Sequence, residues 1–333
     1  YIKHLKEKIL LIKKLGNYLK SNDGNWLDTQ VLAEQKNGWF TREFLEKAAG
    51  NIADNYLKED KLRQWAGYYK LDDNIQEKCV GIVMAGNIPL VGFHDFLCVF
   101  ITGHKQMIKM SSKDDVLLKH LVKVMAGWNS KVNGKVIFAE MLKNCDAYIA
   151  TGSNNSSRYF EQYFGKYPNI IRSNRTSVAV LNGSESTEEL EKLADDMHLY
   201  FGLGCRNVTK IYVPENYDFI PIIKAFDKYQ YFSDHHKYKN NYDYQLSILL
   251  LNGKYYMTNG STLLTQNESF FSPISQVHYQ FYTSPEGMQQ SLQSNRELQC
   301  IVGHSNVPFG QAQNPGLFQY ADSVDTMAFL LGM

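Results

Sequence analysis

The chain has 333 residues, of which 44% are hydrophobic and 21% are charged, a composition typical of a globular protein long enough for two domains. Its formal net charge of +1 excludes a bulk electrostatic attraction to nucleic acid, but it leaves room for a local basic groove that binds a phosphorylated cofactor. No apolar run reaches the roughly 18 residues that span a bilayer, so we expect no integral membrane segment.

The cysteines are few and scattered along the chain. They form neither a C-x-x-C pair nor a metal-ligand spacing, so the sequence predicts no metal site and a reducing, cytoplasmic setting. The five cysteines are Cys79, Cys98, Cys145, Cys205 and Cys300.

The first 75 residues have helical periodicity, with charged faces and with Leu, Ile and Tyr at helical spacing. Residues 1–20 are lysine-rich and amphipathic. This pattern favours a helix packed through one apolar stripe over a helix that lies on a membrane surface.

Strand and helix patterns then alternate. Such alternation predicts parallel βαβ units and a doubly wound sheet. The dinucleotide fingerprint G-x-G-x-x-G is absent after the first strand, so a bound nucleotide would have its phosphates held in another way. The expected strands are 79–86, 105–110, 134–140 and 146–153, and the expected helices are 94–101 and 114–128.

A second unit is predicted to begin with a strand at 176–181, which gives domains 1–174 and 175–333. Ser186 and Glu189 form a capping box, and apolar residues at helical spacing follow as far as Phe201. We expect a strand at 210–215 and a hairpin over 246–258, where two strand-like runs flank Asn-Gly.

Cys205 lies just beyond this helix, in the sequence "GLGCRN", before a strand. Glycine at 202 and 204 lets the backbone approach a ligand, and Arg206 would favour the thiolate. A small buried cysteine is the alternative, but the loop suits a nucleophile better.

Six motifs in a fixed order resemble the aldehyde dehydrogenase superfamily, and more closely its bacterial long-chain acyl-CoA reductases. The resemblance implies an α/β fold with a Rossmann-type cofactor domain in the first half and an α/β catalytic domain in the second. The motifs are "AGNIP" (85–89), "MIKMSS" (107–112), "ATGS" (150–153), "GLGCRN" (202–207), "SFFSP" (269–273) and "VPFG" (307–310).

The resemblance assigns roles to residues of these motifs. Cys205 becomes the nucleophile, and the side-chain amide of Asn87 and the backbone N–H of Cys205 become the donors to the oxyanion. Lys109 becomes a contact to the adenosine ribose. Ser112 stands where NAD-preferring relatives carry glutamate and is followed by Lys113, which favours the 2′-phosphate of NADPH.

The resemblance also implies further cofactor contacts. Phe271 would pack near the nicotinamide ribose, and the strand-to-helix turn at Thr151, Gly152 and Ser153 would face a phosphate or that ribose; Ser153 would equally serve only as an N-cap. The further residues that the resemblance assigns to cofactor binding are Gly86, Thr151, Gly152, Ser153 and Phe271.

One expected residue is missing. Hydrolytic relatives carry a glutamate base in a segment that corresponds to "RSNRTS" (172–177), where Arg172 or a neighbour stands and no carboxylate is present. A thioester on Cys205 would therefore survive to react with a thiol or a hydride. His304 is either a proton donor to the product or, more commonly for a single loop histidine, structural.

Together, these residues and the resemblance predict an enzyme that reduces acyl-CoA to fatty aldehyde with NADPH. The preference for long acyl chains rests on the resemblance alone. The aromatic residues of 217–282 would line an acyl tunnel or simply fill a core. The partners would be the acyl-CoA substrate and either a second copy or an aldehyde-consuming enzyme. Two alternatives remain: a reductase of the same fold that uses acyl phosphate or acyl carrier protein, and a non-catalytic relative that binds nucleotide or acyl groups.

Overall fold

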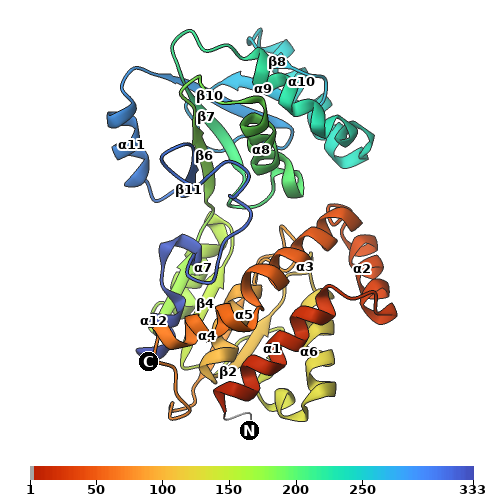
Figure 1. The fold of residues 1–333 in the computed structure, drawn as a ribbon, viewed down its shortest axis with the longest axis vertical. Helices are drawn as coiled ribbons and strands as arrows, with labels where there is room; N and C mark the ends of the chain where they lie inside the picture. Colours follow the sequence, from red (N-terminus) through yellow and green to blue (C-terminus); the bar gives the residue numbers. More distant parts are fainter. Residues whose placement is uncertain (1–3) are drawn as a thin grey trace. The chain divides into compact units, whose positions relative to one another are not determined.

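The computed structural model describes residues 4–333, which divide into two compact units (Figure 1). The first unit extends to Asn174 and also includes Pro315–Met333, and the second is Arg175–Asn314. The expected domain 175–333 is therefore wrong for its tail, because the tail packs with the first unit. Tyr320 accepts a hydrogen bond from Trp65 Nε1 (2.8 Å), and Met327 and Leu330 are buried in the same core.

Four helices precede the first sheet: α1 (Leu5–Leu19), α2 (Gly24–Lys36), α3 (Arg42–Tyr56) and α4 (Glu59–Tyr68). Helix α1 buries Ile9, Ile12 and Leu15 and packs on its neighbours α3 and α4, as its apolar stripe predicts. Residues 1–3 of the predicted amphipathic segment lie outside the described residues.

The first sheet is parallel, with strand order β3-β2-β1-β4-β5. The expected strands and helices are confirmed, with ends a few residues shorter or longer, as is the doubly wound architecture. The strands are β1 (Cys79–Val83), β2 (Lys105–Lys109), β3 (Val136–Phe138), β4 (Ala147–Thr151) and β5 (Asn169–Arg172). The helices are α5 (Phe93–Thr102), α6 (Leu117–Trp128), η1 (Ser130–Gly134), α7 (Asn154–Phe164) and, from the tail, η4 (Ala321–Ser323) and α12 (Thr326–Leu331).

The second unit has a six-stranded sheet of order β11-β6-β7-β10-β9-β8, in which only β8 runs antiparallel to its neighbour. Its strands are β6 (Thr176–Val180), β7 (Val208–Pro214), β8 (Met257–Thr258), β9 (Leu263–Gln266), β10 (Gln276–Tyr282) and β11 (Leu298–Val302). Its helices are α8 (Thr187–His198), η2 (Leu199–Gly202), α9 (Ile220–Ala225), η3 (Phe226–Asp234), α10 (His236–Leu251) and α11 (Pro285–Gln293).

The hairpin expected over 246–258 is wrong, because its first half continues helix α10. Tyr242, Leu246 and Leu249 lie at helical spacing and pack together with Leu263. Gly253 has a φ of 58° and its N–H donates to Leu250 O (3.1 Å), so Asn-Gly ends a helix here instead of turning a hairpin.

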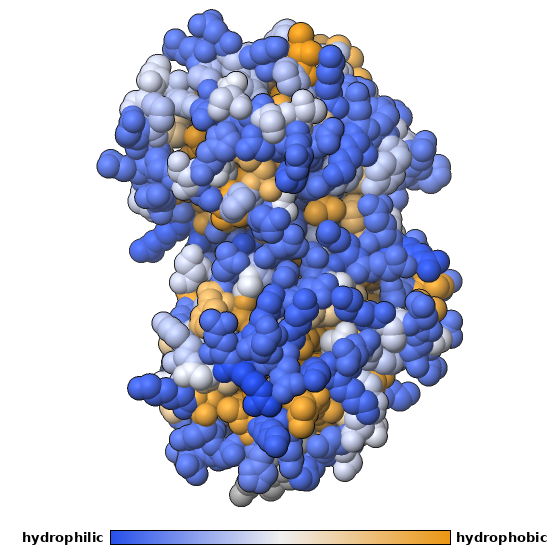
Figure 2. Space-filling model, in the orientation of Figure 1, coloured by the Kyte–Doolittle hydropathy of each residue, from blue (hydrophilic) through white to orange (hydrophobic). Residues whose placement is uncertain are grey.

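The face in Figure 2 is mainly hydrophilic, interrupted by separate hydrophobic groups, as is normal for globular proteins. Within residues 4–333, no helix combines the length and the apolar character that a membrane crossing requires.

Candidate active site

Except for Phe271, the residues predicted to bind the cofactor lie at one edge of the first sheet, together with Asn87. Strand β1 lies between β2 and β4, and all three are parallel, so their carboxyl ends meet at the same edge. Asn87 follows β1, Lys109 ends β2, and Ser153 follows β4. The strand order reverses between β1 and β4, and ligands of open α/β sheets bind at such a point.

The loop after β1, residues 84–92, is fastened to the loop after β2. Asp114 accepts a hydrogen bond from the N–H of Leu90 (2.9 Å), which has a φ of 57°. A Cβ at Gly86 would lie 2.7 Å from Ser111 Oγ, so only glycine fits this close approach. Asp114 is 5% exposed, and burial raises its pKa to about 6. Asp114 thus shapes the loop that carries Asn87, a role that its sequence position did not signal.

The turn after β2 presents polar side chains to solvent. Lys109, Ser112 and Lys113 are all exposed. The main chain of Lys113 is held on both sides, since its N–H donates to Ser111 Oγ (3.2 Å) and its carbonyl accepts from Asn37 Nδ2 (3.1 Å). This turn therefore offers two cations and a hydroxyl from a fixed backbone.

The turn after β4 leads into helix α7. Ser153 caps this helix, because its Oγ accepts from the N–H of Ser156 (3.2 Å). A Cβ at Gly152 would lie 2.9 Å from Ser156 Cβ, so the turn is tightly closed. The hydroxyl of Thr151 accepts from Arg172 Nη1 (3.3 Å). The N-terminus of α7 thus opens at the same sheet edge, where backbone N–H groups favour anions.

Arg172 ends β5 and is 3% exposed. Its guanidinium forms a bidentate pair with Asp95, at 2.5 and 3.0 Å, and also donates to Thr326 Oγ1 (3.2 Å). Arg172, predicted from the sequence to lie at or next to the position of the hydrolytic base, is therefore a buried cation that joins β5, α5 and the tail.

Cys205 belongs to the second unit, in the loop 203–207 between η2 and β7, and is half-buried. Three residues in succession before it adopt left-handed backbone angles, with φ of 57° at Tyr200, 55° at Phe201 and 74° at Gly202. Such angles cost a non-glycine residue roughly 1–2 kcal/mol. Both aromatic residues are buried, and the ring of Phe201 lies 4.5 Å from that of Phe232. Backbone strain held in place by packing is a feature of functional sites.

Asn207 holds this loop in shape. It is fully buried, and its Oδ1 accepts from the N–H of Gly204 (2.8 Å). Its Nδ2 donates to the carbonyls of Leu199 (2.9 Å) and Asp196 (3.1 Å), where helix α8 ends. A single amide thus closes the Cys205 loop and caps the helix before it. Sequence reasoning missed Asn207, and its only signal was an asparagine two residues after the cysteine.

Ser177 of β6 supports the same loop from the sheet. Its Oγ donates to the carbonyl of Cys205 (3.0 Å), and its backbone N–H donates to the carbonyl of Asn207 (3.1 Å). The same Oγ accepts from the N–H of Cys300 (3.2 Å). The backbone at Cys205 is therefore fixed by side chains on both sides of the loop.

Asp196 connects helix α8 to residues 307–312, which contain the "VPFG" motif. This segment, here named the tail loop, belongs to the second unit and precedes the tail that packs with the first. Its carboxylate accepts from the N–H groups of Gly310 (2.7 Å) and Ala312 (3.0 Å). The side chain is fully buried, and burial raises its pKa to about 7. Asp196 and Asn207 therefore join the tail loop and the Cys205 loop to the same end of α8.

Phe271 lies in the loop 268–271, three of whose carbonyls are bound by side chains of the sheet. Lys210 Nζ donates to Glu268 O (2.6 Å), His278 Nδ1 lies 2.9 Å from Ser269 O, and Thr209 Oγ1 donates to Phe270 O (2.6 Å). Lys210 is fully buried, which lowers its pKa to about 8. Phe271 itself is 37% exposed, so this loop presents an aromatic ring on a rigid backbone.

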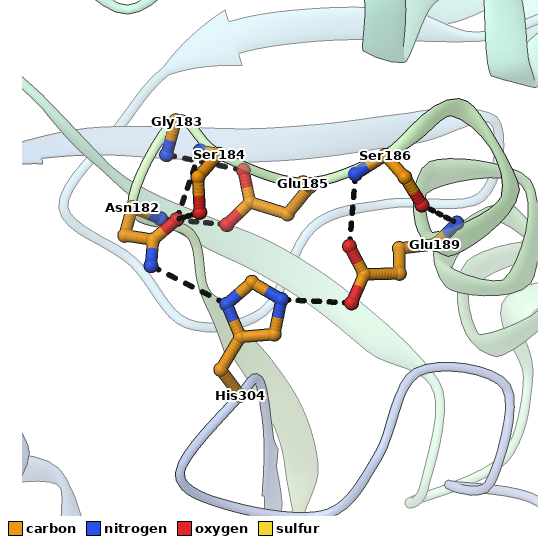
Figure 3. Close-up of polar contacts among 7 residues, drawn as sticks. All are labelled: Asn182, Gly183, Ser184, Glu185, Ser186, Glu189 and His304. Atoms are coloured by element: carbon orange, nitrogen blue, oxygen red, sulfur yellow. Dashed lines mark hydrogen bonds and ion pairs between the residues drawn. The ribbon is translucent and has the colours of Figure 1, made fainter.

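His304 lies in a polar network with the start of α8 (Figure 3). Its Nε2 lies 2.8 Å from Glu189 Oε1, and its Nδ1 lies 3.3 Å from Asn182 Nδ2. Glu189 also accepts from the N–H of Ser186 (2.8 Å), which completes the predicted capping box. These contacts favour the structural interpretation of His304.

A small cavity lies behind the left-handed turn. It has a volume of about 30 Å³ and is lined by Met197, His198, Phe201, Thr262 and residues 272–277, among others. This volume suits a water molecule and is too small for an acyl chain. The neighbouring aromatic residues, such as Phe232 and Tyr238 with ring centres 5.0 Å apart, pack on one another. Here they fill a core.

Comparisons with known proteins agree with this architecture. The sequence profile of the acyl-CoA reductase (LuxC) family matches residues 42–220, which include Asn87 and Cys205. No curated protein sequence matches the chain.

Solved structures with a similar fold are aldehyde dehydrogenases of low sequence identity. A mutant enzyme from Bacillus cereus has a TM-score of 0.64 at 12% identity, over 90% of this chain and 71% of that one. An indole-3-acetaldehyde dehydrogenase mutant from P. syringae, solved with NAD+ and IAA, has a TM-score of 0.61 at 11% identity, with coverages of 90% and 71%. With its aldehyde dehydrogenase fold and a profile match over more than half of its length, the chain belongs to the acyl-CoA reductase (LuxC) family.

Proposed function

We propose that this enzyme reduces acyl-CoA thioesters, preferably long-chain, to aldehydes with NADPH, through an acyl group carried on Cys205. The observation that carries the proposal is the Cys205 loop itself. A strained left-handed turn precedes it, and Asn207 and Ser177 hold its backbone by hydrogen bonds. A cysteine that served only to fill a core would require none of this support.

The carboxyl edge of the first sheet fits a phosphorylated dinucleotide. Lys109 and Lys113 are exposed cations there, and helix α7 directs its N-terminus to the same edge. Ser112 leaves space and hydrogen-bonding capacity where a carboxylate would repel a 2′-phosphate. These residues would hold the cofactor and favour NADPH. When bound, the nicotinamide supplies the hydride that reduces the acyl group to an aldehyde.

The chemistry of the chain's own residues begins with acylation. The Cys205 thiolate forms a bond to the thioester carbonyl carbon, and the C–S bond to coenzyme A then breaks, which releases the CoA thiolate. The backbone N–H of Cys205 and the side chain of Asn87 are the proposed donors to the oxyanion. Reduction then frees the Cys205 thiolate for another cycle.

The residues of segment 172–177 argue against hydrolysis of the acyl group. Arg172 forms an ion pair with Asp95, and the segment contains no carboxylate that would take a proton from water. The acyl thioester therefore persists until it is reduced or returned to coenzyme A.

The test is the loss of NADPH absorbance, with NADH in parallel, on addition of acyl-CoAs of increasing chain length. We expect turnover by the wild type and none by Cys205→Ala, whereas Cys79→Ala, at a half-buried cysteine of the other unit, retains it. Asn87→Ala should slow acylation about a hundredfold, which corresponds to the order of 3 kcal/mol for one oxyanion donor.

Other donors separate the remaining possibilities. Turnover with an acyl phosphate or an acyl carrier protein, and not with acyl-CoA, would change the assigned substrate and leave Cys205 as the assigned nucleophile. A Cys205 thiol of ordinary reactivity toward iodoacetamide near neutral pH, without turnover of any donor, would contradict the proposal as a whole.

A further inference from the structure

Two cysteines face each other at the amino-terminal edge of the first sheet. Cys79 begins β1, and Cys145 precedes the adjacent parallel strand β4. Their sulfur atoms lie 3.8 Å apart. The edge is opposite the one that carries Asn87 and Lys109, so the pair is separate from the proposed cofactor residues.

The backbone fixes the two cysteines beside each other. The N–H of Cys79 donates to Asp146 Oδ2 (2.7 Å), and the N–H of Asp146 donates to the carbonyl of Cys79 (2.8 Å). A Cβ at Gly81 would lie 3.2 Å from Cys145 Sγ, so glycine leaves the space that the Cys145 side chain occupies. A disulfide places its sulfur atoms about 2 Å apart, so these two sulfur atoms must approach each other by roughly another 2 Å to bond.

The two thiols differ in access and acidity. Cys79 is half-buried and Cys145 is 4% exposed, so a small oxidant meets Cys79 first. Contact with Cys145 lowers the pKa of Cys79 to about 7, an effect that Lys105 assists and that partial burial, Asp146 and Glu77 oppose. Cys79 thus has the thiolate character and exposure that favour oxidation.

We propose that Cys79 and Cys145 form a dithiol that hydroperoxides oxidise to an intramolecular disulfide. The Cys79 thiolate attacks one oxygen of hydrogen peroxide and the O–O bond breaks; the leaving hydroxide takes a proton from solvent, so that a sulfenic acid and water form. The Cys145 thiol then attacks the sulfenic sulfur, an S–S bond forms, and the hydroxyl leaves as a second water. In sum, two thiols lose two protons and two electrons, and one hydrogen peroxide takes them up and becomes two waters.

Cys98 and Cys300 provide an internal contrast. Cys98 is fully buried, and burial raises its pKa well above the ordinary value. Burial also raises the pKa of Cys300, although Ser177 and Arg206 oppose this. Neither thiol therefore has the properties of Cys79.

The experiment uses the full chain, reduced and then treated with hydrogen peroxide near pH 7.5 in modest excess. Remaining thiols are alkylated, and intact mass and tryptic peptides are measured. We expect peptides 79–105 and 144–158 to be joined until a reductant separates them, and neither Cys79 nor Cys145 to be alkylated. Because peptide 79–105 also contains Cys98, the link should persist in Cys98→Ser and disappear in Cys79→Ser.

Three results would overturn the proposal: five alkylated cysteines in the treated wild type, a joined peptide pair in Cys79→Ser, or oxidation of Cys79 without linkage to Cys145. The peptide map of the wild type decides the question even if a variant folds poorly. None of these readouts depends on acyl-CoA reduction, so the result stands apart from the proposed function.

Discussion

Asn207 and Asp196 are joined by a hydrogen bond of 3.1 Å from the Asn207 amide to the Asp196 carbonyl, while the Asp196 carboxylate binds the tail loop. The two residues are fully buried at the end of helix α8. Loops that carry two separate sequence motifs, "GLGCRN" and "VPFG", thus share one support. A change at either residue should alter the Cys205 loop without touching the reacting atoms.

Asn207→Ala should reduce kcat more than tenfold and slow the alkylation of Cys205 by iodoacetamide. The change leaves the N–H of Gly204 and the carbonyl of Leu199 without their partner, at a cost of about 1–3 kcal/mol in the free energy of unfolding for each buried group. Kinetics, alkylation followed by mass spectrometry, and urea denaturation measure the three effects.

The matched control is Asn252→Ala, which removes an exposed amide that donates to Ile248 O (2.8 Å) in the same unit. This variant should alkylate at the wild-type rate. An equal loss of alkylation in both variants would mean that Asn207 acts on stability in general and has no special link to Cys205.

Asp196 should make stability depend on pH. Its pKa is raised to about 7 in the folded protein from the model-compound value of 3.8, so the folded state binds the proton more tightly than the unfolded state. The contribution of Asp196 protonation to the free energy of unfolding is therefore fully present below about pH 4 and is lost as the pH rises toward 7. The loss is at most about 1.4 kcal/mol per pH unit.

Denaturation of the wild type and Asp196→Asn at pH 5 and pH 7 checks this sign. The free energy of unfolding of the wild type, relative to the variant, should fall by about 2 kcal/mol over this interval. Asp114 titrates in both proteins and cancels in the comparison. A relative stability that rises with pH would show that the two backbone N–H groups outweigh burial.

The sequence predicted the alternating strands and helices of the first sheet because buried parallel strands appear as continuous apolar runs that end in glycine or polar residues. It predicted the capping box at Ser186 for a similarly local reason. The hairpin at 246–258 failed because an apolar run beside Asn-Gly fits a helix end as well as a turn. The position of the tail depends on contacts such as Trp65 with Tyr320, 255 residues apart in the chain, which no local pattern records.

The candidate site also combines local features that the sequence predicts with long-range contacts that it does not. The position of Cys205 after a helix and before a strand is local information. The supports at Asn207, Asp196 and Ser177 are buried hydrogen bonds between separate segments, and polar residues of these types are usually found in turns or on the surface.

Ser112→Glu should shift the cofactor preference from NADPH toward NADH at least tenfold. A carboxylate at this exposed turn repels a 2′-phosphate and accepts hydrogen bonds from ribose hydroxyls. Lys113→Met should raise KM for NADPH and leave KM for NADH nearly unchanged. Initial rates with both cofactors measure these effects, and an equal change for both cofactors in each variant would remove this turn from phosphate recognition.

Lys210→Met should raise KM for NADPH several-fold with a smaller effect on kcat. Nζ binds Glu268 O (2.6 Å) and Gln280 Oε1 (2.7 Å), so its loss frees the loop that presents Phe271. The control is Lys224→Met, at an exposed lysine of the same unit. Phe271→Ala should have the same kinetic signature. If Phe271→Ala changes KM and Lys210→Met does not, the loop keeps its shape without the lysine.

Asp95 and Arg172 should depend on each other for stability. Arg172→Met leaves a buried carboxylate without its bidentate partner, and breaking a buried pair in this way costs about 3–5 kcal/mol. The double variant Asp95→Leu with Arg172→Met removes both charges and should recover most of this loss, since apolar residues of similar size replace buried ion pairs with little penalty. Urea denaturation of the single and double variants gives the coupling energy. Additive losses would mean that Thr326 and Thr151, which also contact the guanidinium, account for the role of Arg172.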